Sequence, residues 1–166
     1  FWVFQTLNGL TTGALLFFLA SGLTVVFGLM RILNLAHGAL FLFGGYVGYT
    51  VGERTGSFLL AALAGALAGG LLGVAIQQAF ARTLLRSPFN QVLLTLGIAF
   101  VVGNAVLWIW GGDPRLLRPP AVLSGSVAVA GVVYPVYRLF LIVLAVVAGA
   151  LIWAFWERSR AGAPVR

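Results

Sequence analysis

The sequence contains no cysteine and no lysine, and its 166 residues include one histidine and only three acids. The missing cysteines exclude disulfides and thiolate metal sites. The missing lysine excludes a glycine-rich phosphate-binding loop that ends in lysine. Glu53, Asp113 and Glu157 are far apart in the sequence and lie outside the long apolar runs, so no carboxylate pair or metal-ligating cluster is present. We therefore expect neither an enzyme nor a metal or other cofactor site.

Apolar residues are abundant instead. They make up 61% of the chain, and 8% of the residues are charged, whereas soluble domains carry about 25% charged residues. The net charge of +7 comes from arginines that stand singly or in pairs between apolar runs. This placement is typical of loops at a membrane surface and not of a nucleic-acid groove. The composition predicts an integral membrane protein in contact with lipid.

Five apolar segments approach the length of about 20 residues that a membrane-spanning helix needs. We therefore predict an all-α, polytopic helical bundle that forms a single transmembrane domain. Ser87 and Pro88 are typical of a helix N-cap and its first residue, and they precede the fourth span. The long connection 111–137 alternates weakly around Ala130 and Gly131, which allows a short hairpin. The predicted spans cover roughly residues 7–29, 32–51, 57–80, 90–110 and 138–156.

The arginines also predict an orientation. If Phe1 lies outside, more arginines fall on the cytoplasmic side than on the external side, as the positive-inside rule requires. The connection 111–137 is then external, and residues 157–166 form a cytoplasmic tail. The arginines assigned to the cytoplasmic face are Arg31, Arg82, Arg86, Arg158, Arg160 and Arg166.

Glycines recur at every fourth residue in the second and third spans. This spacing places small residues on one helix face, where backbones can approach closely in lipid. One interpretation is static packing, and the other is a pair of helices that slide or rock during transport. The glycines are Gly44, Gly48 and Gly52 in the second span and Gly65, Gly69 and Gly73 in the third.

Asn34 and His37 are unusual polar residues in the predicted second span. Three positions apart on a helix, they would share one face. Polar groups in hydrocarbon need partners, so these two either fix helix packing through a hydrogen bond or line the transport path or its cytoplasmic gate. Gly38 would loosen the helix beside them. In the fourth span, Thr95 and Asn104 are weaker candidates for the same role.

The stretch GLTVVFGLMRILNLAHGALFLFGGYVGY, at residues 22–49, resembles the permease subunits of branched-chain amino acid ABC importers of the LivH/LivM type. Its Asn-Leu-Ala-His-Gly core at residues 34–38 is the most specific part. The segments SPFNQVLLTLGIAF, WGGDPR and ERSRAGAPVR are similar to later parts of the same family, in the same order. Ala39 stands where many relatives carry an acidic residue. The chain ends about where the ATPase-coupling half of the family would begin, so we expect a truncated fragment, a split gene product or a remnant.

The resemblance implies a multi-pass protein of the bacterial inner membrane that forms the path for branched-chain or other apolar amino acids. It implies three kinds of partner: a second, homologous permease, cytoplasmic ABC ATPases that hydrolyse ATP, and an external substrate-binding protein. Two alternatives remain at this stage. One is a non-transporting helical module that assembles through its glycine faces, and the other is a small channel or secondary carrier.

Overall fold

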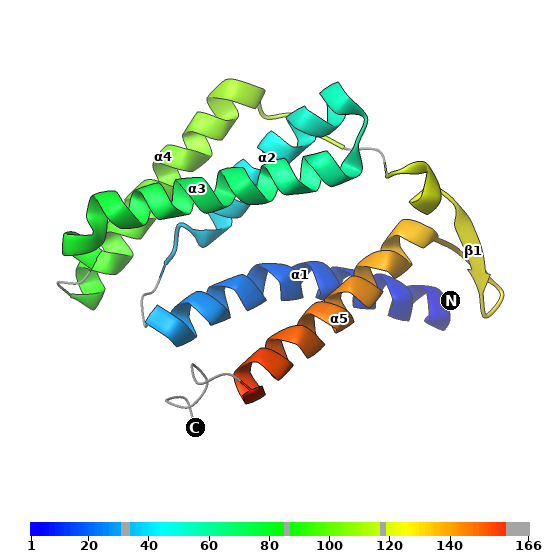
Figure 1. The fold of residues 1–166 in the computed structure, drawn as a ribbon. Helices are drawn as coiled ribbons and strands as arrows, with labels where there is room; N and C mark the ends of the chain where they lie inside the picture. The colour runs from blue at the N-terminus through cyan, green and yellow to red at the C-terminus, as the bar shows by residue number, and fades with distance from the viewer. Residues whose placement is uncertain (31–33, 85–86, 117–118, 159–166) are drawn as a thin grey trace. The chain divides into compact units, whose positions relative to one another are not determined.

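The computed structural model describes residues 1–30, 34–84, 87–116 and 119–158 (Figure 1). Within these residues there are five α-helices, and α1, α3, α4 and α5 are long and apolar enough to cross a membrane. These findings confirm an all-α, polytopic membrane protein. The helices are α1 (Trp2–Met30), α2 (His37–Thr55), α3 (Phe58–Leu84), α4 (Pro88–Trp110) and α5 (Val136–Arg158).

Helix α2 differs from its predicted span. The prediction began it at Ile32, but residues 34–36 form a turn and the helix begins at His37. Helix α2 is also less apolar than the other four, because it contains several glycines together with His37, Glu53 and Arg54. The other predicted spans lie inside helices, except that Ser57 precedes α3. Of the arginines assigned to the cytoplasmic face, Arg82 and Arg158 lie in α3 and α5, and the rest lie outside the described residues.

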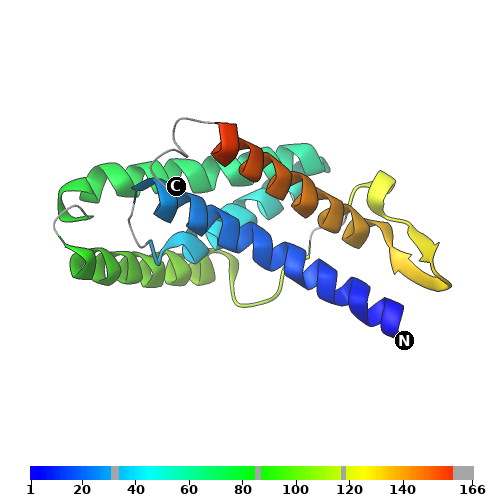
Figure 2. The same cartoon turned by 90° about the horizontal axis from the view of Figure 1, so that it is seen from below.

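The chain divides into two compact units. The middle unit is Met30–Arg118, and the terminal unit combines Phe1–Leu29 with Pro119–Arg166. The middle unit contains α2, α3 and α4, of which α2 packs closely against α3 and also contacts α4 (Figure 2).

Local signals explain where the middle-unit helices begin and end. Helix α2 ends at Gly56, whose positive φ of 67° suits glycine and whose N–H donates to the carbonyl of Gly52 at 2.8 Å. Helix α4 begins as the sequence predicts, because the Ser87 hydroxyl accepts from the N–H of Asn90 and Pro88 occupies the first turn.

The terminal unit contains α1, α5, a short 3₁₀ helix η1 (Ala121–Leu123) and the hairpin of β1 (Ser126–Val129) and β2 (Val132–Pro135). The strands are antiparallel, with Val127 opposite Tyr134. Ala130 and Gly131 both have positive φ, at 49° and 79°, as a two-residue hairpin turn requires. This hairpin confirms the one that the alternating sequence allowed.

Tyr134 fastens the hairpin to the helices of its own unit. Its side chain is fully buried, and its hydroxyl donates to Asn8 Oδ1 at 3.1 Å and lies 2.9 Å from Thr11 Oγ1. Arg138 of α5 donates to the same Asn8 oxygen at 2.8 Å, and its guanidinium carbon lies 5.9 Å from the centre of the Tyr134 ring. Helices α1 and α5 are therefore joined to strand β2 by one polar cluster.

Candidate functional site

The turn before α2 is built by Asn34. Its side-chain oxygen accepts from the N–H of Ala36 at 3.0 Å, and its carbonyl accepts from the N–H of His37 at 3.2 Å. An asparagine that bonds the backbone two residues ahead favours a turn over a helix. The prediction that Asn34 and His37 share one face of a continuous helix is therefore wrong. We call Asn34–Ala36 the Asn34 turn.

Thr95 of α4 holds this turn. Its hydroxyl accepts from the N–H of Leu35 at 3.2 Å and donates to the carbonyl of Gln91 at 2.6 Å. Thr95 is 2% exposed and Ala36 is 1% exposed. An N–H released by a break in a membrane helix needs a partner, because the hydrocarbon region offers no water. Thr95 supplies that partner, and so the Asn34 turn and α4 form a single site.

The other candidate residues, His37, Gly38 and Asn104, are not bonded to the Asn34 turn through their side chains. The His37 side chain is half-buried at the first position of α2 and makes no hydrogen bond to the residues that the structure describes. Gly38 is exposed, and a Cβ there would meet nothing within 4 Å. Asn104 is exposed and donates to the carbonyl of Phe100 in its own helix at 2.8 Å. The structure thus brings Asn34, His37 and Thr95 to one place and leaves Asn104 about 13 Å further along α4 than Thr95, at 1.5 Å per residue.

The glycines of α2 and α3 lie against each other inside the middle unit. A Cβ on Gly44 would lie 2.7 Å from the carbonyl oxygen of Gly65, and one on Gly65 would lie 2.6 Å from that of Gly44. Gly48 approaches the carbonyl of Ala61 equally closely. Separations this short leave no room for a side chain, so the backbones are in direct contact.

The contact on α3 is shifted by one helical turn from the predicted one. It runs from Ala61 through Gly65, and a Cβ on Gly69 would be 3.4 Å from the nearest atom, the carbonyl oxygen of Leu40. Gly73 would meet only the side chain of Leu40 at 3.7 Å. Gly52 is buried on α2. The sequence carried a signal for Ala61, because it is the small residue four positions before Gly65.

A second connection within the middle unit joins α2 to the end of α4. Trp110 Nε1 donates to the Thr50 hydroxyl at 2.8 Å, and the Trp110 ring lies 5.5 Å from that of Tyr46 and 6.3 Å from that of Phe43. The sequence analysis did not predict this contact between Tyr46 and Trp110. Nothing in the spacing of these residues indicates that they meet.

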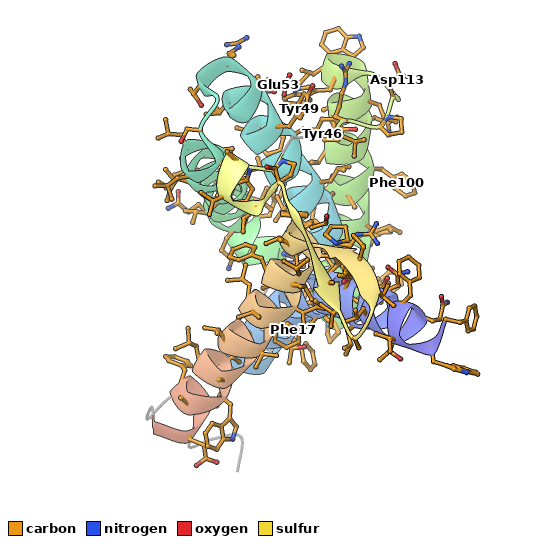
Figure 3. The ribbon with its side chains drawn as sticks, turned by 90° about the vertical axis from the view of Figure 1, so that its right-hand side faces the viewer. Phe17, Tyr46, Tyr49, Glu53, Phe100 and Asp113 are labelled. Atoms are coloured by element: carbon orange, nitrogen blue, oxygen red, sulfur yellow. The ribbon has the colours of Figure 1, made fainter. Side chains whose placement is uncertain are left out.

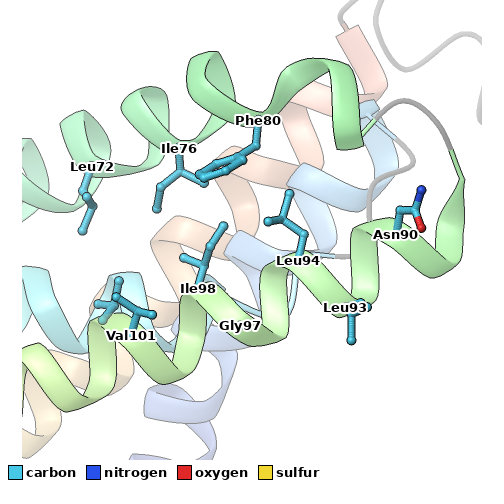
Figure 4. A pocket seen from close by; sticks show the side chains of 10 residues that line it. Leu72, Ile76, Phe80, Asn90, Leu93, Leu94, Gly97, Ile98 and Val101 are labelled. Atoms are coloured by element: carbon cyan, nitrogen blue, oxygen red, sulfur yellow. The ribbon is translucent and has the colours of Figure 1, made fainter.

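A groove of about 710 Å³ lies between α3 and α4 (Figure 4). Its walls include Leu72, Ile76 and Phe80 of α3 and Leu94 and Ile98 of α4. Asn90 supplies the one polar side chain of the lining. A charged ammonium or carboxylate would lose its hydration there without compensation, so this groove is unsuited to an amino acid.

Comparison with known proteins identifies the family of this chain. Residues 5–166 match the family described as branched-chain amino acid transport system, permease component. BraD of Pseudomonas aeruginosa is a high-affinity branched-chain amino acid transport system permease protein. It is 24% identical to this chain over an alignment of 182 residues, gaps included, and the alignment covers 98% of this chain and 57% of BraD.

LivH of Escherichia coli K12, a permease protein of the same kind of system, is 35% identical over 65 residues, or 35% of this chain and 21% of LivH. The chain thus spans little more than half the length of BraD. No solved structure matches it. The family match extends over nearly the whole chain, and the chain belongs to the permease components of branched-chain amino acid transport systems.

Proposed function

We propose that this chain forms part of the path by which an ABC importer moves branched-chain or other apolar amino acids across the bacterial inner membrane. Family membership and the printed functions of BraD and LivH support this proposal. The buried polar side chains of the described residues are Thr11, Gln91 and Thr95, none of which is charged. Such an interior suits a zwitterion without net charge and offers no relay for protons.

The observation that carries the mechanism is the Leu35–Thr95 hydrogen bond. The chain passes from the terminal unit to the middle unit between Leu29 and Met30, just before the Asn34 turn. We assign the Asn34 turn to the fixed end of a hinge, because Thr95 holds this turn on α4. During transport, α1 would change direction about this turn. Hinges are formed by a few residues at the ends of elements that absorb changes in φ and ψ.

We infer from the glycine contacts that α2 and α3 move together as one rigid pair, on the middle-unit side of this hinge. These contacts also weaken the alternative of a membrane module that assembles through its glycine faces. Gly44, Gly48 and Gly65 are already covered within the chain, so these faces are not available to another molecule.

The proposed partners follow from the family. They are a second permease subunit, cytoplasmic ABC ATPases and an external substrate-binding protein, with Phe1 outside and Arg166 inside. Selectivity then lies mainly in the binding protein, and the permease supplies the path. Co-purification of ATPase subunits with the tagged chain would separate an ABC permease from a channel or a secondary carrier.

The test is leucine uptake by the complete transporter in proteoliposomes. His37→Leu removes a polar group beside the Asn34 turn, and we expect it to reduce ATP-driven uptake while the affinity of the binding protein for leucine is unchanged. Asn104→Leu is the matched change on α4, where the amide is bonded within its own helix, and it should leave uptake unchanged. Wild-type uptake by His37→Leu at equal abundance would remove His37 from the mechanism.

A further inference from the structure

A second cavity of the middle unit lies along α2 and has a different character from the apolar groove. It measures about 270 Å³. This volume is just below the range of about 300–1,000 Å³ for pockets that hold drug-sized ligands, so it suits a smaller molecule. Tyr46 lies on the side of α2 toward α4 (Figure 3). The lining consists of Phe41, Leu42, Gly45, Tyr46 and Tyr49 of α2 and Arg115 from the segment after α4.

Arg115 is tethered at this cavity and keeps its charge available. Its Nη2 donates to the carbonyl of Trp110 at 3.0 Å, and Trp110 is in turn bonded to Thr50 of α2. No carboxylate in the described part of the chain forms an ion pair with Arg115. A guanidinium has five N–H donors, so donors remain for a carboxylate, which arginine commonly binds through two parallel hydrogen bonds.

The remaining walls are aromatic and aliphatic. Phe41 is 60% exposed and Leu42 is 43% exposed within the structure, so both offer apolar surface to a ligand. The rings of Tyr46 and Tyr49 can attract an ammonium group through their faces. Gly45 leaves open space above the helix, because a Cβ there would meet nothing within 4 Å.

We propose that this cavity binds a free α-amino acid with an apolar side chain. The carboxylate bonds to Arg115, the side chain packs against Phe41 and Leu42, and the ammonium faces the tyrosine rings. This inference rests on the proposed function and adds a substrate site to it, along residues 41–49 of α2. An anionic lipid headgroup shares the attraction to Arg115, but its acyl chains exceed so small a cavity.

The test is equilibrium binding of radiolabelled L-leucine to the purified full chain in neutral detergent. Arg115→Gln keeps a donor for the Trp110 carbonyl but removes the charge. Gly45→Leu places a side chain in the cavity, from a position where the added Cβ meets nothing within 4 Å. We expect each to weaken binding about tenfold or more, as the loss of charge-assisted bonds or of space implies. Gly70→Leu is the matched control, because its Cβ also meets nothing within 4 Å, and it should bind like wild type.

Competitors define the ligand chemistry. Leucinamide, which has no carboxylate, and glycine, which has no apolar side chain, should compete poorly with leucine. Equal competition by leucinamide, or wild-type binding by Arg115→Gln, would overturn the proposal. Displacement of leucine by anionic but not by neutral lipid in nanodiscs would show a lipid site instead. If the complete transporter carries leucine while neither it nor the chain binds leucine at Arg115, the site is refuted and the transport function stands.

Discussion

The N–H of Leu35 and the hydroxyl of Thr95, sixty positions apart in the sequence, are joined by a 3.2 Å hydrogen bond. This bond lets the chain leave the helical conformation before α2 without stranding a backbone donor in an apolar environment. It also fixes the break on α4. The position of the break is therefore determined by a tertiary contact as well as by Asn34.

Replacing Thr95 with valine should destabilise the protein. Valine keeps the shape of threonine but leaves the part-buried Leu35 N–H without this acceptor. We expect a cost of about 1 kcal/mol, the low end for an unsatisfied buried donor. Thermal unfolding in detergent would show the loss as a lower midpoint. Thr95→Ser retains the hydroxyl and should unfold close to wild type. Equal midpoints for the valine and serine variants would show that the bond contributes nothing to stability.

Alanine substitutions at the glycines of α2 and α3 should lower stability in proportion to how close the added Cβ comes to the facing helix. Gly44→Ala and Gly65→Ala place a Cβ within 2.7 Å of a backbone oxygen, so the helices must separate, at a cost of about 1–3 kcal/mol typical of overpacking. Gly69→Ala should be milder, because its nearest atom is 3.4 Å away. Gly70→Ala meets nothing and serves as the control. Thermal midpoints that fail to follow this order would contradict a direct backbone contact between α2 and α3.

Removing the Tyr134 hydroxyl should loosen the hairpin. Tyr134→Phe deletes the bonds to Asn8 and Thr11, and a hydrogen bond contributes about 0.5–1.5 kcal/mol. Limited proteolysis at the Ala130–Gly131 turn should become faster. Tyr137→Phe is the matched control, because the Tyr137 hydroxyl makes no hydrogen bond to the described residues. Cleavage at the same rate in both variants would show that the cluster does not restrain the hairpin.

The absence of native cysteines allows a direct test of orientation. A single cysteine at Ser126, in the hairpin, should react with a membrane-impermeant thiol reagent on intact cells. One at Ser159, near the C-terminus, should react only after the membrane is opened. The reverse labelling pattern would invert the topology that the arginines predict.

The sequence was sufficient to predict where the helices lie, apart from the start of α2, but it did not predict which helix faces contact each other. Apolar length located the helices, the Ser87–Pro88 signal located the start of α4, and the Ala130–Gly131 pair located the hairpin turn. These features depend on neighbouring residues, which periodicity and turn chemistry describe well. Asn34 was predicted inside a helix because it stands in a long apolar run, and composition alone gives little weight to one residue that favours a turn.

The sequence named polar residues that lie near the Asn34 turn, but it did not predict their contacts. Asn34, His37 and Thr95 were each chosen for being polar within an apolar run, and the structure brings them to one turn. That Thr95 bonds the backbone of Leu35, and that Ala61 extends the glycine contact, depends on which helix faces which. One sequence without tertiary information cannot supply that pairing.

The most direct test of the hinge is leucine uptake by the complete transporter with Asn34 replaced. Asn34→Ala removes the side-chain acceptor for the Ala36 N–H, so residues 34–36 should leave the turn and favour the helical conformation. Asn34→Ser keeps a side-chain oxygen that can form a similar turn. At equal membrane abundance, we predict that the alanine variant loses uptake about fivefold or more, since one hydrogen bond of about 1 kcal/mol is at stake, while the serine variant keeps most of it. Wild-type uptake by Asn34→Ala would contradict the assignment of the Asn34 turn as the hinge of this permease.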